Sequence, residues 1–195
     1  MFLNLIYCIE QALAAIGSAV SEQQTIRTVR LILRPFNIED SMHVQNLAGA
    51  REISDVTANI PHPYLYGMAQ KWISTHPENW KKRERATFAI VLIETGQLIG
   101  CISLISINTE QPELGYWIGV DYWGNGYCTE ACKAIIRFGF NELGLPKIFG
   151  KHLSRNPSSG KVMTNSGLSY IQTGREQIGS MKHAEEFKLY GIQRN

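Results

Sequence analysis

The chain has 195 residues, of which 19 are Lys or Arg and 17 are Asp or Glu, so its formal net charge is only +2. This length suits one compact domain, and 44% apolar against 18% charged residues argues against a disordered chain. The scattered Lys and Arg give no reason to expect a nucleic-acid groove or a polybasic membrane patch. Four cysteines are too few and too unevenly placed for a disulfide scaffold, which favours a reduced, cytoplasmic protein.

Residues 1–25 are predicted to be a helical extension and linker outside a single domain, which we place at 26–195. Apolar residues in this extension follow the spacing of an amphipathic helix that packs on the domain or on a second copy of the chain. Glu10 interrupts the apolar run, and no basic residue precedes Arg27, so we expect neither a spanning helix nor a secretory signal. A weak membrane leader is the less favoured alternative. A homodimer could form through this helix or through the last strands.

The first part of the domain is predicted to contain a strand followed by two helices. Residues 28–33 alternate enough for a strand, which Pro35 ends. Asn37 is placed to cap a helix with two acidic residues in its first turn. Residues 68–80 are predicted to form a second helix, broken or kinked at Pro77.

The second part contains most of the predicted strands. Runs at 88–93 and 97–107 flank Glu94-Thr95-Gly96, which is a strong hairpin signal. The elements expected after them are a strand at 113–120, a helix at 129–143, a strand at 147–153, a helix at 156–166, and strands at 170–178 and 186–192. This order predicts an α/β fold with a mixed sheet flanked by helices, and not a doubly wound parallel sheet.

The segment that carries most chemical information joins the strand at 113–120 to the helix after it. Gly124 and Gly126 can turn several backbone N–H groups toward one point, where they add to the unpaired N–H groups and positive dipole of the helix. Glycine also lets an oxygen approach the backbone without meeting a Cβ. A phosphate or diphosphate is the expected occupant, although an ordinary strand-to-helix turn explains two glycines about equally well.

Other phosphate-binding motifs do not fit this loop. A dinucleotide fingerprint would need a third glycine where Thr129 stands, and a P-loop would need Gly-Lys-Ser/Thr. Gly115 and Gly119 share one face of the preceding strand, where glycine often marks a bulge or the close approach of a ligand or another backbone. Asn156-Pro-Ser-Ser159 starts a helix with polar side chains directly after a strand, and a plain helix cap is the alternative explanation.

Two motifs resemble the cofactor motifs of the GNAT N-acetyltransferase superfamily. Trp123-Gly-Asn-Gly126-Tyr-Cys128 is similar to its Q/R-x-x-G-x-G/A acetyl-CoA motif, and Asn156-x-x-Ser159 with Gly167-Leu168 is similar to N-x-x-S-x(7)-G-F. The segment 113–127, followed by Thr-Glu-Ala, most resembles the RimJ/RimL-like branch of ribosomal-protein-alanine N-acetyltransferases. The resemblance covers about residues 28–194. It implies a central, mostly antiparallel sheet whose middle strands splay apart.

The resemblance also implies acetyl-CoA as co-substrate and assigns roles to individual residues. Backbone N–H groups after the first loop glycine should hold the diphosphate, the end of the preceding strand should pair with the pantetheine arm, and Asn156 with Ser159 should support that arm. The expected cofactor-binding residues are Ile118, Gly119, Val120, Trp123, Gly124, Asn125, Gly126, Tyr127, Cys128, Thr129, Asn156 and Ser159.

Three residues depart from the family pattern. Trp123 stands where Arg or Gln is commoner, so backbone dipoles would do more of the phosphate binding. Cys128 replaces a smaller residue; it shares a helix face with Cys132, yet no further ligand cluster supports zinc, and we expect no metal. Met163 occupies the position of a Tyr that many members use as general acid. Because methionine has no proton to donate, a solvent proton or another hydroxyl would have to serve.

These features predict direct transfer of an acetyl group from acetyl-CoA to a primary amine, most simply a protein N-terminal α-amine of ribosomal-protein type. Glu113 is the candidate general base, and a solvated carboxylate at a strand end is the alternative. A backbone N–H near Val120 is predicted to polarise the thioester carbonyl. Two other functions stay open: acetylation of a small-molecule amine, and a non-catalytic acyl-CoA-binding sensor, which Met163 slightly favours.

Overall fold

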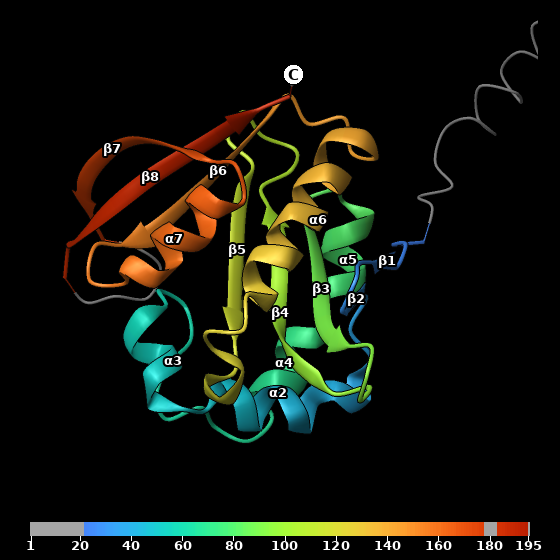
Figure 1. Ribbon diagram of the computed structural model, residues 1–195. Coiled ribbons are helices and arrows are strands. Elements are labelled where there is room, and N and C mark those ends of the chain that lie inside the picture. The colour runs from blue at the N-terminus through green and yellow to red at the C-terminus, as the bar shows by residue number, and fades with distance from the viewer. Residues whose placement is uncertain (1–21, 178–182, 195) are drawn as a thin grey trace, which may run out of the picture.

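The computed structural model describes residues 22–177 and 183–194 (Figure 1), so most of the predicted N-terminal extension lies outside the described residues. The described strands form one eight-stranded sheet in the order β1-β2-β3-β4-β5-β6-β8-β7. Their bounds are β1 (Ile26–Arg27), β2 (Leu31–Arg34), β3 (Arg85–Leu92), β4 (Leu98–Ile105), β5 (Glu113–Ile118), β6 (Lys147–Leu153), β7 (Ser169–Glu176) and β8 (Glu185–Gln193).

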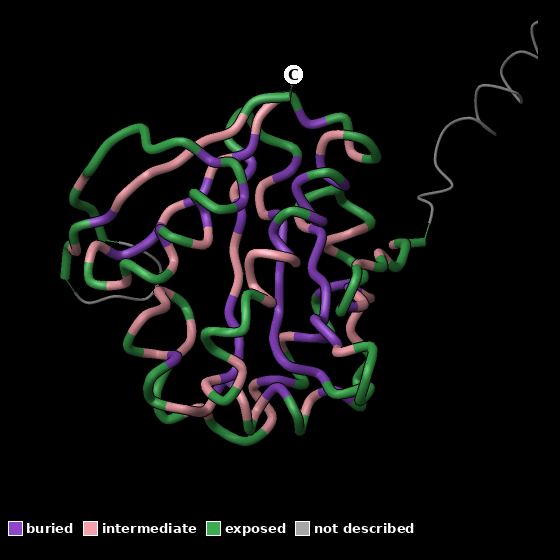
Figure 2. The backbone as a smooth tube through the Cα atoms, in the orientation of Figure 1, coloured by how far each residue is buried: buried purple, intermediate pink, exposed green. Residues whose placement is uncertain are grey.

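Helices cover both faces of this sheet. The α-helices are α2 (Ser41–Ala48), α3 (Arg51–Val56), α4 (Met68–Ile73), α5 (His76–Lys81), α6 (Tyr127–Asn141) and α7 (Pro157–Asn165), and short 3-10 helices lie at Ile38–Asp40 and Val120–Tyr122. On one face, α6 packs over a core that includes Phe88 and Ile102, and Figure 1 shows it crossing the strands. On the other face, α2, α3 and α4 pack around Trp117. Figure 2 shows that the central strands β3 and β4 are buried along nearly their whole length.

All strand pairs are antiparallel except β5 and β6, which α6 connects as a crossover. This parallel pair is very short, because only Glu113 with Phe149 and Leu114 with Gly150 are in register. Beyond these residues, β6 runs obliquely away from β5 (Figure 1). The predicted mixed, mostly antiparallel sheet with splayed middle strands is therefore confirmed.

The structure differs from the sequence prediction in several helix boundaries and in two short elements. Residues 68–80 form two helices, α4 and α5, separated at Ser74–Thr75. Pro77 lies in the first turn of α5 and not at a kink, because the N–H that proline lacks has no helical partner there. The helix after the glycine loop begins at Tyr127, two residues before the predicted start. Helix α3 and the two-residue strand β1 were not predicted, since neither is long enough to show a periodic pattern.

A half-buried ion pair fixes the turn between β2 and α2. The guanidinium of Arg34 donates to both carboxylate oxygens of Asp40 at 2.7 and 2.8 Å, and the N–H of Asn37 donates to Asp40 Oδ2 at 2.8 Å. Burial alone would raise the pKa of Asp40, but these hydrogen bonds and the Arg34 charge outweigh it and hold the pKa below its ordinary value. The predicted capping role of Asn37 therefore operates through its backbone and Asp40.

We expect Asp40→Asn to lower the free energy of unfolding by about 1–3 kcal/mol at pH 7, because the half-buried Arg34 loses its charged partner. A carboxyl whose pKa is depressed by folding stabilises the protein above its unfolded pKa, and this contribution disappears as the pH falls through the folded pKa. Denaturant unfolding of both proteins at pH 7 and near pH 3 measures it. An equal difference at both pH values would contradict this account.

Candidate functional site

The glycine loop lies between β5 and α6 and has the backbone conformation that only glycine adopts readily. Gly124 has φ +78° and Gly126 has φ +75°. A Cβ on Gly124 would meet nothing within 4 Å, and one on Gly126 would lie 3.6 Å from Arg30 Nη2. Glycine is therefore required at both positions by the backbone turn and not by crowding within the protein.

This loop leaves backbone donors without acceptors at the start of α6. Among residues 22–177 and 183–194, no hydrogen bond uses the N–H of Asn125, Gly126, Cys128 or Thr129 as its donor. The side-chain amide of Asn125 closes the loop by donating to the carbonyls of Tyr122 and Trp123 at 3.2 and 3.1 Å. Because α6 has 15 residues, its dipole adds to these free donors, and the arrangement has the properties of an anion-binding site.

Trp123 attaches the same loop to the end of β5. Its indole Nε1 donates to the carbonyl of Ile118 at 2.6 Å. The residue that replaces the family's Arg or Gln therefore uses its only side-chain donor within the protein. A phosphate at this loop would therefore receive no hydrogen bond from the Trp123 side chain and would depend on other donors, such as the backbone N–H groups.

The end of β5 offers only part of the backbone edge that the sequence predicted for the pantetheine arm. The N–H of Gly119 donates to Ile99 O at 2.8 Å, so the odd-numbered residues of β5 point their backbone N–H and C=O groups toward β4. The even-numbered residues point theirs in the opposite direction, toward the opening that β6 leaves where it diverges. Ile118 thus presents its N–H to the opening, whereas the N–H of Gly119 is not available. Tyr116, which the sequence reading did not include, presents its backbone there as well.

The two strand glycines are explained by packing. A Cβ on Gly119 would lie 2.7 Å from Leu47 Cδ2 of α2, and a Cβ on Gly115 would lie 3.0 Å from Ile105 Cδ1. Both distances are shorter than ordinary carbon contacts. These glycines therefore allow close packing of protein groups, and their presence gives no support for a ligand on that face.

Asn156 and Ser159 lie together at the start of α7, beside the diverging strands. The Asn156 side chain accepts from the Ser159 N–H at 3.2 Å, so it is the helix cap, and its amide donates to Val56 O at 3.4 Å. The hydroxyl of Tyr116 reaches across from β5 to Ser159, 2.8 Å from its Oγ and 3.0 Å from its carbonyl oxygen. Burial raises the pKa of Tyr116, which keeps this hydroxyl protonated.

Glu113 lies at the start of β5, on the strand face opposite α6. Burial raises the pKa of its carboxyl; the positive charge of Lys151 opposes this shift and the negative charge of Glu176 reinforces it. Lys151 and Glu176 form an ion pair with each other. A carboxylate with a raised pKa is a better proton acceptor than an exposed one, so the site chemistry suits a general base.

A cavity of about 790 Å³ lies between α3 and the chain just before α7. It was not predicted, because α3, which forms one wall, was not predicted. Its lining includes Arg51, Asp55, Thr57, His62 and Arg155. Arg155 Nε donates to Asp55 O at 3.1 Å, and its Nη1 lies 2.5 Å from Glu185 Oε2. Since Arg155 directly precedes Asn156, the cavity adjoins the start of α7.

Other candidate chemistries find little support in the part of the chain that the structure describes. Met163, at the family's Tyr position, is buried against β6 near Gly150. No group of three or more His, Cys, Asp or Glu residues in the described ranges could hold a metal ion. Burial raises the pKa of the Cys132 thiol well above its usual value. None of the described helices has the length and apolar character needed to cross a membrane.

Two solved structures illustrate the fold that this chain shares with other proteins. Ribosomal-protein-S5-alanine acetyltransferase from Vibrio fischeri superposes with a TM-score of 0.76 at 17% identity, covering 88% of this chain and 97% of that one. RimJ from Mycobacterium smegmatis, in complex with CoA-disulfide, superposes with a TM-score of 0.79 at 16% identity, covering 88% of each chain. Identities this low establish the fold alone.

Sequence relatives share parts of this chain at higher identity. The uncharacterized N-acetyltransferase p20 of Bacillus licheniformis is 28% identical over 153 residues, which are 77% of this chain and 84% of p20. The FsC-acetyl coenzyme A-N(2)-transacetylase of Aspergillus fumigatus is 34% identical over 68 residues, which are 35% of this chain and only 29% of the fungal protein. Residues 30–169 match the family model described as acetyltransferase (GNAT) domain. With the diverging strands and the glycine loop in place, the chain belongs to the GNAT acetyltransferase family.

Proposed function

We propose that this protein transfers the acetyl group of acetyl-CoA to a primary amine, most simply the α-amine at a protein N-terminus. One observation carries the proposal: within a GNAT chain, the free N–H groups at residues 125–129 lie at the start of α6, next to the end of β5. We assign this activity to a single domain at 26–195.

The residues present fit coenzyme A. The left-handed glycine loop leaves unpaired donors of the kind that bind a diphosphate, and the Ile118 N–H faces the opening where an amide chain could pair as an added strand. Asn156 and Ser159 lie across that opening. Acetyl-CoA would supply an acetyl group activated as a thioester.

The chain's own groups would carry the proton transfers. Glu113 accepts a proton from the incoming ammonium, directly or through water, because only the neutral amine can attack. The amine nitrogen forms a bond to the thioester carbon while the carbon–sulfur bond breaks. The predicted N–H near Val120 lies seven residues beyond Glu113, roughly 20 Å along the strand, so the carbonyl oxygen would instead accept from a backbone N–H nearer Glu113, such as that of Tyr116. The nitrogen gives up its second proton to solvent as the amide forms, and the CoA thiolate takes one from solvent or from a hydroxyl, for which the Tyr116–Ser159 pair lies at the opening.

A protein N-terminus as the acceptor is supported by a structural neighbour and is compatible with the cavity beside Asn156. A structural neighbour is named as a ribosomal-protein acetyltransferase, and the cavity beside Asn156 is wide enough for the end of a peptide. The same cavity would also admit a small-molecule amine. The buried Met163 favours a non-catalytic acyl-CoA sensor as the second candidate. A cytoplasmic location and a homodimer stay predictions.

Release of free CoA from acetyl-CoA separates these functions. The protein is incubated with acetyl-CoA alone, with peptides that carry a free N-terminus, with the same peptides acetylated at the N-terminus, and with a panel of small amines. The proposal expects CoA release only with free-amine peptides. CoA release with small amines alone would identify a small-molecule amine as the acceptor. Tight binding of acetyl-CoA without CoA release would support the sensor.

A further inference from the structure

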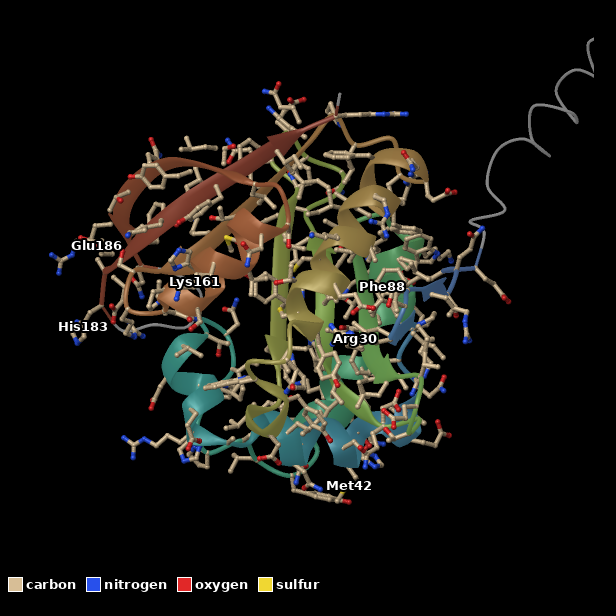
Figure 3. The ribbon with its side chains drawn as sticks, in the orientation of Figure 1. Arg30, Met42, Phe88, Lys161, His183 and Glu186 are labelled. Atoms are coloured by element: carbon tan, nitrogen blue, oxygen red, sulfur yellow. The ribbon has the colours of Figure 1, made fainter. Side chains whose placement is uncertain are left out.

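Arg30, in the turn between β1 and β2, makes contacts with the glycine loop although it lies 95 residues away in sequence. Its Nη1 donates to the carbonyl of Asn125 at 3.0 Å, and its Nε lies 2.7 Å from Glu130 Oε2 in the first turn of α6. Its backbone N–H donates to Glu130 Oε1 at 2.8 Å. Figure 3 shows Arg30 beside the beginning of this helix.

These contacts fix the orientation of one peptide group in the loop. In a trans peptide the C=O and N–H bonds point in opposite directions. Because the Asn125 carbonyl is bound to Arg30, the N–H of Gly126 in the same peptide must point away from Arg30. That N–H donates to no acceptor among the described residues. Arg30 thereby directs a free donor outward from the loop.

Glu130 and Tyr127 hold the guanidinium in this position. Thr28 Oγ1 donates to Glu130 Oε1 at 2.6 Å, so Thr28 and Arg30, both in the turn, hold this carboxylate together. The Arg30 Cζ lies 4.6 Å from the centre of the Tyr127 ring, which stacks against the planar cation. Both partners belong to the first turn of α6.

One nitrogen of Arg30 is left for a ligand. Nη2 takes part in none of the hydrogen bonds found in the described ranges, and it lies 3.6 Å from where a Cβ on Gly126 would be. The Arg30 side chain as a whole is 46% exposed, so a ligand at the edge of the loop could approach its guanidinium. Trp123 leaves the loop without the cationic or amide side chain that the family motif supplies, and Arg30 places a guanidinium there instead.

We propose that Arg30 anchors the diphosphate of coenzyme A, by orienting the Gly126 N–H toward it and by donating from Nη2 to one of its oxygens. This inference rests on the proposed function, because it assumes that coenzyme A occupies the loop. It adds a residue outside both cofactor motifs to the binding site. It also accounts for the replacement of the motif's first residue by tryptophan.

The test compares Arg30→Met and Arg30→Lys with Arg27→Met, a control that removes an exposed arginine of β1 three residues earlier. Calorimetry measures binding of coenzyme A and of pantetheine, which has no diphosphate. Arg30→Met is expected to weaken coenzyme A binding at least about tenfold and to leave pantetheine binding unchanged. Arg30→Lys should restore only part of the loss, since an ammonium cannot hold Glu130 and Asn125 as a planar fork does.

Kinetics supply an independent readout. The KM for acetyl-CoA should rise in Arg30→Met while kcat at saturation stays within about twofold, and Arg27→Met should match the native protein in both. Glu130→Gln, which removes the ion pair that holds the guanidinium, serves if Arg30→Met does not fold; it should weaken coenzyme A binding about two- to fivefold and leave pantetheine binding unchanged. Equal losses for coenzyme A and pantetheine, or none, would overturn the role of Arg30. If the native protein itself binds no coenzyme A, the proposed function fails first.

Discussion

Replacing Glu113 with Gln is expected to lower kcat at saturating acetyl-CoA by roughly 10²–10⁴-fold, the range typical of a lost general base. Gln preserves the size of the side chain at the start of β5, so the affinity for coenzyme A should not change. The matched control is Glu110→Gln, which alters an exposed carboxylate three residues earlier in the chain. Steady-state rates with a peptide acceptor, measured alongside coenzyme A binding, give the comparison.

The pH dependence gives this prediction a second readout. Burial raises the pKa of Glu113, and a base works only when deprotonated, so the acidic limb of kcat/KM should lie above the ordinary carboxyl pKa. Activity falls as the pH drops through that value, and the limb should be absent in Glu113→Gln. Acetyl transfer that continues undiminished in this variant from pH 6 to 9 would remove Glu113 from the role of base.

Gly126→Ala is expected to weaken coenzyme A binding at least about tenfold, which corresponds to the loss of one good hydrogen bond to a charged group. The added Cβ would project from a residue at φ +75°, beside the N–H groups that we assign to the diphosphate. An L-residue in this conformation also costs roughly 1–2 kcal/mol of stability. Calorimetry with coenzyme A measures the affinity, and thermal unfolding measures the stability.

Gly144→Ala separates the two effects. Gly144 has φ +68° after the C-terminal end of α6, and a Cβ there would meet nothing within 4 Å, as at Gly124. Gly144→Ala should therefore lower stability by a similar amount without changing coenzyme A affinity. If both variants lost affinity equally, backbone strain in α6 would explain the result, and the loop glycine would have no specific place in the cofactor site.

Elements that depend on neighbours in sequence could be predicted from the sequence. The hairpin at Glu94-Thr95-Gly96 and the left-handed loop at Gly124 and Gly126 follow from turn chemistry, and both are present. The order of strands and helices was also sufficient for the mixed sheet. Boundaries shifted where a left-handed glycine, and not periodicity, marks the helix start, as at Gly126 before Tyr127.

Features that depend on residues distant in sequence could not be predicted. The role of Gly119 required knowledge of Leu47 across the sheet, and the cavity required α3, which is too short to show amphipathic spacing. The contact of Arg30 with Asn125 joins two segments that no local pattern links. The alternation of side chains along β5 was visible in the sequence. Which residues point their backbone groups toward β6 followed only from the Gly119–Ile99 hydrogen bond.

The brevity of the β5–β6 pairing has a consequence for how the sheet avoids self-association. Unpaired strand edges usually recruit strands from other molecules, and proteins protect them when they lie on the outside of a sheet. Here two such edges lie in the interior of the strand order, between β5 and β6, and α7 packs beside them through the contact of its Ser159 with Tyr116 of β5. The neighbouring strands and α7 therefore shield these edges from strands of other molecules, while the edges keep backbone groups with which an extended amide chain can pair.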